Sequence, residues 1–131
     1  MKASVTEWGR WPNFSAAEFR CQHTGADGMD ATFMDRLQAL RADFGKPMVI
    51  SSGYRDPSHP IEAAKPQPGA HASGRACDVR VEGGEALELV ALAYRHGFTG
   101  IGVQQKGGGR FIHLDDLPHA PNRPRPWIWS Y

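Results

Sequence analysis

The sequence has no long apolar run and no surplus of charge of one sign. A helix that crosses a bilayer needs about 20 consecutive apolar residues, and no segment of this chain provides them. Fifteen basic and fourteen acidic residues give a net charge of +1. A basic surface of the kind that binds nucleic acid or anionic lipid is therefore not expected. We predict neither a nucleic-acid partner nor a membrane partner.

The N-terminal stretch MKASVTEWGRWPNF also lacks the apolar centre of a secretory signal. We therefore expect the chain to be made in the cytoplasm as a soluble protein, unless another route exports it.

Cysteine is scarce. Cys21 and Cys77 are the only two, which is too few for a disulfide framework. Cys77 lies in an apparent strand beside Val79, and we interpret it as a small buried apolar residue. Cys21 and His23 in FRCQHTG could bind a metal ion, but a lone C-x-H pair is a weak signal. We interpret that segment as a loop with incidental polar residues.

Two segments carry the periodicity of helices. In MDATFMDRLQALRADFG, apolar residues recur at helical spacing, Asp30 can cap the start, and Gly45 can end the helix. GEALELVALAYRHG predicts the second main helix. A shorter helix is expected to begin at Ser15, because Glu18 three residues later completes a capping box.

Four short apolar segments predict strands: a buried one from Met48 to Ser51, then ACDVRV, GIGVQQ and RFIHLDD. The KGGG stretch between the last two predicts a hairpin. The tail PNRPRPWIWSY is aromatic and interrupted by proline, and we assign it no element. Helices followed by strands indicate an α+β fold, with a small, mostly antiparallel sheet and two main helices. The length suits a single domain over residues 1–131.

A long loop separates the first strand from the second. The stretch DPSHPIEAAKPQPG, residues 56–69, holds four prolines and shows no periodicity. Loops of this length without structure of their own are usually functional or disordered. This loop ends just before His71, so we expect it to line a cleft, with His59 and Glu62 as its polar side chains.

The stretch GAHASGRACDVRV places polar residues where a buried strand begins. His71 ends the long loop, Gly74 permits a turn, and Asp78 lies on the following strand. A buried carboxylate without a partner is costly, and a metal ion removes that cost. His113 in FIHLDD, on another apolar strand, offers a third ligand. Each residue alone is more often a satisfied core residue, but two histidines and a carboxylate, with an open position for water, compose a catalytic zinc site.

Two further residues are candidates for the chemistry. Side chains at i and i+2 of a strand share a face, so Asp115 lies beside His113, whereas Leu114 and Asp116 point away. Asp115 is a candidate for a general base or for the partner that orients a histidine ligand, and the spacing leaves both roles open. Arg55, just past a strand in SSGYR, offers a cation to a substrate carboxylate or a developing oxyanion, or else forms a surface salt bridge.

The motifs SSGYR, HASGRACD, and GIGV followed by FIHLD resemble those of the zinc peptidases of bacterial cell walls. These are the D-Ala-D-Ala carboxypeptidases, the vancomycin-resistance dipeptidases and the L-alanyl-D-glutamate or cross-link endopeptidases, whose fold is shared with the hedgehog signalling domain. The similarity runs from NFSAAEF to FIHLDD. It is closest to the branch whose last motif reads F-V-H-x-D, which includes phage lysins and periplasmic murein endopeptidases.

The resemblance implies roles for individual residues. It makes Arg55 the residue that holds the substrate or the polarised carbonyl. Asp115 matches the family's aspartate after the last histidine, and its role stays our inference. The implied Zn²⁺ ligands are His71, Asp78 and His113.

The sequence departs from these relatives at two places. Many relatives have Ser two residues before the first histidine, where this chain has Gly69, so we expect it to lack a hydrogen bond to the substrate or behind the metal ligands. Relatives with a carboxylate shortly before the last histidine use it as a base, but this chain reads GGGRF there. His59 or Glu62 is an alternative source of the base. Trp127 and Trp129 either form a wall of the cleft or pack in the core.

We therefore predict a zinc metallopeptidase that hydrolyses peptide bonds in the stem peptide or cross-link of peptidoglycan. Its partner is the peptidoglycan peptide, and we expect a monomer that acts at the bacterial wall or in the periplasm, as a phage-encoded lysin or a cellular enzyme would. The alternative is a zinc-containing cell-wall binding or structural domain without turnover. The choice between carboxypeptidase and endopeptidase stays open.

Overall fold

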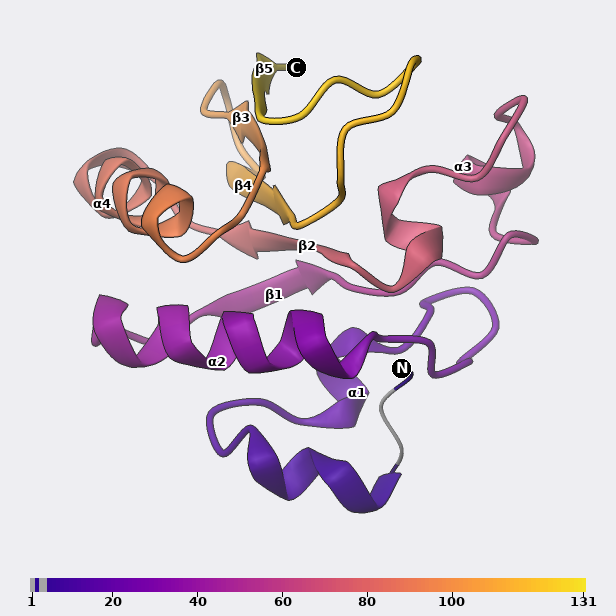
Figure 1. Cartoon of the computed structure of the whole chain (residues 1–131), viewed down its shortest axis with the longest axis horizontal. Helices are drawn as coiled ribbons and strands as arrows, with labels where there is room; N and C mark the ends of the chain where they lie inside the picture. The colour runs from indigo at the N-terminus through magenta and orange to yellow at the C-terminus, as the bar shows by residue number, and fades with distance from the viewer. Residues whose placement is uncertain (1, 3–4) are drawn as a thin grey trace.

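A five-stranded sheet lies at the centre of the computed structural model, which describes residue 2 and residues 5–131 (Figure 1). The strands are β1 (Val49–Ser52), β2 (Ala76–Arg80), β3 (Gly100–Gln104), β4 (Phe111–Asp115) and β5 (Trp127–Ser130). Their order across the sheet is β1-β2-β4-β3-β5. The predicted β3–β4 hairpin is present, and the α+β class is confirmed.

The sheet is mixed, which corrects the expected mostly antiparallel arrangement. The pairs β1–β2, β2–β4 and β4–β3 are antiparallel, but β5 runs parallel to β3. The segment 116–126 carries the chain from the end of β4 past β3, so β5 enters beside β3 in the same direction. Strand β1 is also at an edge, and Val49 is 55% exposed, whereas the sequence predicted a buried strand there.

The helical elements are η1 (Val5–Arg10), α1 (Ala16–Phe19), α2 (Ala31–Phe44), α3 (Pro60–Ala63), η2 (Ala70–Ser73) and α4 (Gly83–Arg95). The two long ones, α2 and α4, are the two main helices that the periodicity predicted. The short α3 lies within the stretch that was expected to be an unstructured loop. None of the described helices is long and apolar enough to cross a membrane.

The predicted helix caps are present. The backbone N–H of Ser15 donates to the Glu18 carboxylate at 2.8 Å, which closes the capping box of α1. The Asp30 carboxylate accepts from the N–H of Phe33 at 2.9 Å and so caps α2. Gly45 ends α2 with φ of 69°, a left-handed conformation that favours glycine.

The hydrophobic core lies against one face of the sheet. Alternate strand residues such as Cys77, Val79 and Leu114 are buried there, together with apolar side chains of α2, α4 and the N-terminal segment. The thiol of Cys77 lies in this core, which confirms its interpretation as a small apolar residue. Because side chains alternate along a strand, the residues between these project from the opposite face. That face carries Asp78, His113 and their neighbours.

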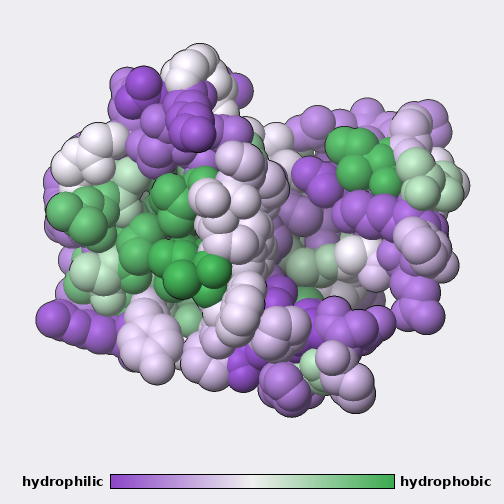
Figure 2. All heavy atoms as spheres, turned by 90° about the horizontal axis from the view of Figure 1, so that it is seen from above, coloured by the Kyte–Doolittle hydropathy of each residue, from purple (hydrophilic) through white to green (hydrophobic). Residues whose placement is uncertain are grey.

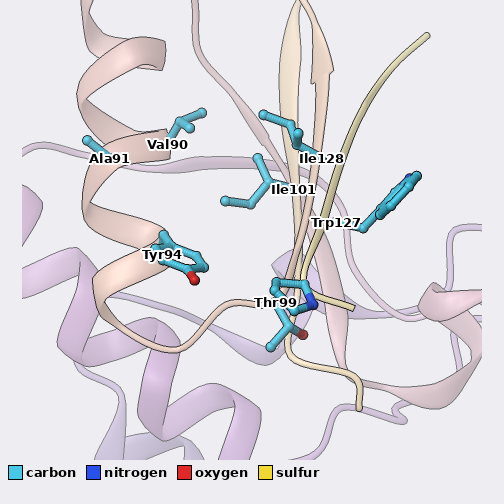
Figure 3. A pocket seen from close by; sticks show the side chains of 8 residues that line it. Val90, Ala91, Tyr94, Thr99, Ile101, Trp127 and Ile128 are labelled. Atoms are coloured by element: carbon cyan, nitrogen blue, oxygen red, sulfur yellow. The ribbon is translucent and has the colours of Figure 1, made fainter. Parts of the chain in front are cut away.

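Strand β5 also borders an apolar groove of about 440 Å³ against α4. Figure 3 shows Ile101 and Ile128 pointing toward Val90 and Tyr94 of α4, and Trp127 borders the same groove at β5. Trp127 is 55% exposed, so it packs neither in the core nor in the cleft that Trp129 lines.

Candidate metal centre and its cleft

A row of residues crosses the sheet on the face opposite the core. Asp78 of β2 pairs with His113 of β4, His113 with Gly102 of β3, and Gly102 with Trp129 of β5. Residues paired in this way project from the same face. Gly102 has no side chain, and a Cβ there would lie 2.7 Å from the indole nitrogen of Trp129. The missing side chain therefore lets the indole lie over β3, with its centroid 5.1 Å from that of the His113 ring.

The three predicted metal ligands meet at one end of this row. Asp78 Oδ1 lies 3.3 Å from His71 Nε2 and 3.2 Å from His113 Nδ1. One possible ligand atom from each residue falls within 4.8 Å of the others, and all three side chains are buried. The row brings together β2 and β4, and η2 adds His71 from the end of the long loop.

Each histidine has its second ring nitrogen bound from outside the cluster. His71 Nδ1 donates to the carbonyl of Gly53 at 2.8 Å, and His113 Nε2 donates to the carboxylate of Asp115 at 2.7 Å. The remaining nitrogen of each ring faces Asp78, where it donates to that carboxylate when protonated and offers a lone pair to a cation when it is not. Histidines that bind metal ions in proteins are held in this way.

Glycine permits the turn that presents His71. Gly74 has φ of 78°, and a Cβ there would lie 2.0 Å from the carbonyl oxygen of Gly28. The turn at Gly74 ends η2 and starts β2, so it fixes His71 relative to Asp78. The His-x-x-Gly spacing of the sequence thus has a local steric cause.

The donor set fits a borderline cation such as Zn²⁺. Two imidazole nitrogens and one carboxylate oxygen leave coordination positions open, as in catalytic rather than structural zinc sites. Burial raises the pKa of the Asp78 carboxyl, but hydrogen bonds and charge from both histidines outweigh burial and hold that pKa far below its usual value. Asp78 is therefore a charged candidate ligand. Among the described residues, no other group of three possible ligands comes together, so Cys21 and His23 form no such cluster.

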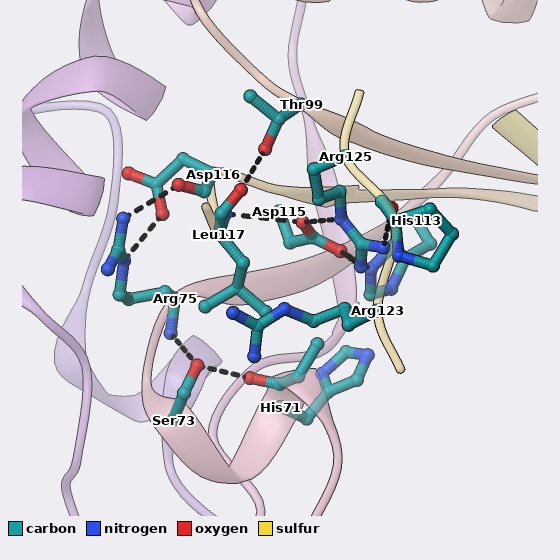
Figure 4. Close-up of polar contacts among 12 residues, drawn as sticks. His71, Ser73, Arg75, Thr99, His113, Asp115, Asp116, Leu117, Arg123 and Arg125 are labelled. Carbon is teal, nitrogen blue, oxygen red and sulfur yellow. Dashed lines mark hydrogen bonds and ion pairs between the residues drawn. The ribbon is translucent and has the colours of Figure 1, made fainter. Parts of the chain in front are cut away.

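Asp115 is fully buried, and both of its oxygens are bound (Figure 4). Arg125 donates from Nε to Oδ1 at 2.9 Å and from Nη2 to Oδ2 at 2.7 Å. Burial raises the pKa of Asp115, but the hydrogen bond from His113 and the ion pair with Arg125 hold it at about 2. A carboxyl with so low a pKa is a poor proton acceptor near neutral pH. The geometry suits the orienting role that the sequence left open beside the role of general base.

Asp116 lies on the other side of the strand, as the alternation predicts (Figure 4). Its oxygens lie 2.9 Å from Arg75 Nε and 3.4 Å from Arg36 Nε. Asp115 thus binds Arg125 on the cleft side, whereas the neighbouring Asp116 binds Arg75 and Arg36 away from the cleft.

Arg55 lies beside the cluster rather than at the surface. Its Nη2 is 3.7 Å from Asp78 Oδ2, its Nη1 is 3.5 Å from Glu62 Oε2, and its side chain is 18% exposed. Arg55, which was predicted to offer a cation to the substrate, therefore lies next to the predicted metal ligands. Glu62, one of the alternative bases, is buried on α3 and paired with this cation. His59 instead caps α3, because its Nδ1 accepts the N–H of Ile61 at 3.1 Å.

A cleft of about 400 Å³ opens over these residues. Figure 2 shows a hollow bordered by hydrophilic side chains on this face of the molecule. Residues of α3 and η2 form one side of the cleft, and residues of β5 and the chain's end form the other. The lining residues are Arg55, Ile61, Lys65, Ala70, His71, Asp78, Phe111, His113, Arg125, Trp129 and Tyr131.

The sequence reasoning missed most of what the tail contributes. Arg125, Trp129 and Tyr131 line the cleft, but only Trp129 was considered for it. A signal was present, since Arg125, Trp127, Trp129 and Tyr131 recur at every second position, which is the period of a strand. The prolines at 124 and 126 obscured that alternation.

Comparison with known proteins agrees with the site. The family described as Peptidase M15 matches residues 12–115, a segment that holds the three candidate ligands, Arg55 and Asp115. Arg125 and Trp129 lie beyond it. A search of curated proteins found no match. The match spans well over half of the sequence, and the chain therefore belongs to the peptidase M15 family.

Proposed function

We propose that the chain is a zinc-dependent peptidase that hydrolyses peptide bonds in the stem peptides or cross-links of peptidoglycan. The convergence of His71, Asp78 and His113 at the base of an open cleft carries this proposal. Membership of the peptidase M15 family supports peptide-bond hydrolysis. The resemblance of the motifs to cell-wall peptidases supports the substrate class and a site of action at the bacterial wall.

The three side chains would hold the ion through His71 Nε2, an oxygen of Asp78 and His113 Nδ1, the atoms that face one another. Bound zinc supplies a Lewis acid that polarises the scissile carbonyl and promotes ionisation of the attacking water. The buried, charged Asp78 and the two fixed tautomers make this donor set ready for a cation.

The surrounding residues would position the substrate and the ligands. Arg55 offers hydrogen-bond donors to a substrate carboxylate or to the oxyanion that develops on the carbonyl. Asp115 holds His113 in one tautomer and orientation, and Arg125 holds Asp115. Trp129 presents an aromatic wall to the bound peptide.

One observation favours the alternative of a zinc-containing domain that binds the cell wall without turnover. Both oxygens of Asp115 are engaged, and Asp78 is the only carboxylate among the described residues that line the cleft. A general base is thus missing from the cleft wall. Such a domain would bind zinc and peptidoglycan and release no product.

Zinc titration and peptide hydrolysis together test the proposal. We expect one zinc ion per chain and zinc-dependent cleavage of a synthetic stem pentapeptide or of a cross-linked peptide dimer, both lost in His113→Ala. His96→Ala is the matched control, because His96 pairs with the exposed Asp43 at 2.9 Å and lies outside the cleft. Zinc binding without cleavage would support the alternative, and full zinc retention by His113→Ala would remove His113 from the ligand set.

A further inference from the structure

Glu62 holds two cations at the edge of the cleft. Its carboxylate is buried, and the residue is 2% exposed. Oε2 lies 3.1 Å from Lys65 Nζ and 3.5 Å from Arg55 Nη1, while Oε1 accepts the N–H of Gly69 at 2.6 Å. One internal carboxylate therefore ties together α3, Arg55 and the loop before His71.

The ammonium group of Lys65 occupies space that Gly69 leaves empty. A Cβ at position 69 would lie 2.7 Å from Lys65 Nζ and 3.3 Å from Glu62 Oε1. A side chain at this position would displace the ammonium from Glu62. Many relatives have serine at the position of Gly69. In this chain the glycine leaves room for Lys65, which lines the cleft.

The charged side chains of Lys65, Arg55 and Glu62 are unequally exposed. Lys65 and Arg55 both line the cleft, with side chains 41% and 18% exposed, whereas the side chain of Glu62 is fully buried. Two positive charges and one negative charge leave a net positive charge facing the cleft. A lysine ammonium carries three N–H donors and a guanidinium carries five, more than the two oxygens of Glu62 accept from them.

The rest of the cleft wall also favours an anionic ligand. Apart from the three candidate metal ligands, the ionisable side chains that line it are Arg55, Lys65, Arg125 and Tyr131. Arg125 is neutralised by Asp115, and burial raises the pKa of Tyr131, which keeps its hydroxyl protonated. With Asp78 binding the metal ion, the positive charge left over is that of Lys65 and Arg55, offset by Glu62 alone.

We propose that Lys65 adds a second cation to Arg55, so that the two form a subsite that selects peptides with a free carboxylate close to the cleaved bond. Lys65 contacts that carboxylate, and Glu62 is a positioning residue that keeps both cations side by side. This inference rests on the proposed peptidase function and adds the chemistry of its substrate. The carboxylate comes from the end of the peptide or from a side chain, as on a γ-linked D-glutamate.

Paired peptides test the subsite and separate the two sources. One pair has a C-terminal carboxylate or amide, and the other has a D-glutamate α-carboxylate that is free or amidated. For the zinc-loaded wild-type protein, the pair in which the carboxylate form has the higher kcat/KM than the amide form shows which carboxylate is bound. Lys65→Met should lower kcat/KM for the carboxylate form by roughly 10- to 100-fold, the scale of one charge-assisted hydrogen bond, and leave the amide form unchanged. Lys65→Arg should retain most of the preference.

Two further variants control the result. Glu62→Gln should raise KM for the carboxylate peptide more than for the amide peptide, because it loosens the cations without touching the candidate metal ligands. Lys46→Met removes a lysine that pairs with Glu88 at the surface, and it should behave as wild type. Equal carboxylate preference in Lys65→Met and wild type would overturn the subsite.

Binding measurements keep this inference separate from the proposed function. Calorimetry with the carboxylate and amide peptides should show weaker carboxylate binding by Lys65→Met even if the wild-type protein cleaves neither. Absence of cleavage would then count against the peptidase alone. Equal binding of both peptides by the wild-type protein would count against the subsite alone.

Discussion

The carboxylate of Asp115 lies against Gly100 on the neighbouring strand, where any other residue would block it. The two residues are paired across β4 and β3, and a Cβ at Gly100 would lie 2.3 Å from both carboxylate oxygens. The space that a side chain would fill is therefore used by Asp115, which reaches Arg125 and His113 from this position.

Gly100→Ala should weaken zinc binding by about 10- to 100-fold, the usual cost of disturbing a residue that orients a histidine ligand. The added methyl displaces the Asp115 carboxylate, and His113 loses its partner. A competition titration with a chelating dye measures the affinity. Gly84→Ala on α4 is the control, because a Cβ there meets nothing within 4 Å. Unchanged zinc affinity in Gly100→Ala would refute the role of Asp115.

Arg125→Met should destabilise the protein by about 3–5 kcal/mol, because it leaves the buried carboxylate of Asp115 without its counter-charge. Combining it with Asp115→Asn removes that unpaired charge, so the double variant should be less destabilised than the sum of the single variants. Urea unfolding of all four proteins gives the coupling energy. Additive effects would show that the ion pair contributes nothing.

Asp115→Asn and Asp116→Asn should have different effects although the residues are adjacent and both pair with arginine. Asp115→Asn removes the charged acceptor of His113 Nε2, so zinc affinity and cleavage should fall together. Asp116→Asn disturbs Arg75 on the other side of the strand, so stability should fall and zinc affinity should stay. Zinc titration and thermal unfolding of both variants make the comparison. Zinc affinity and a cleavage rate near the wild-type values in Asp115→Asn would contradict the orienting role of Asp115.

The sequence predicted the cluster because its candidate ligands stand out locally. Asp78 and His113 are polar residues within apolar strands, and the i, i+2 rule placed Asp115 beside His113 correctly. The partner of Asp115 could not be found in this way. Arg125 reaches it only because the segment 116–126 passes β3 and returns parallel to it, a path that no local pattern specifies.

The fold likewise contains elements that a local pattern predicts and one strand that only tertiary pairing forms. The caps at Ser15, Asp30 and Gly45 are local, so the start of α1 and both ends of α2 were predicted. Strand β5 was missed because its neighbouring prolines suggested a loop and its side chains are half-exposed. Tertiary pairing with β3, rather than an apolar pattern, makes it a strand.

The stability contribution of Glu62 should depend on pH with a defined sign. Burial raises the pKa of Glu62, but the Gly69 N–H, Lys65 and Arg55 outweigh burial and lower it below its usual value. A depressed pKa in the folded state adds stability above the usual glutamate pKa of about 4.3, and that stability is lost as the pH falls through the folded-state pKa. The difference in unfolding free energy between wild type and Glu62→Gln should be constant from about pH 6 to 7 and shrink below about pH 4. A constant difference down to about pH 3 would contradict the ion pairs.

Mass spectrometry of fragments released from purified peptidoglycan tests the central proposal most directly. Zinc-loaded protein should release peptides with new ends, and both a chelator and His113→Ala should abolish the release. The new ends identify the bond and decide between carboxypeptidase and endopeptidase. Folded, zinc-loaded protein that releases no fragment, or releases the same fragments in excess chelator, would contradict a zinc peptidase of the cell wall.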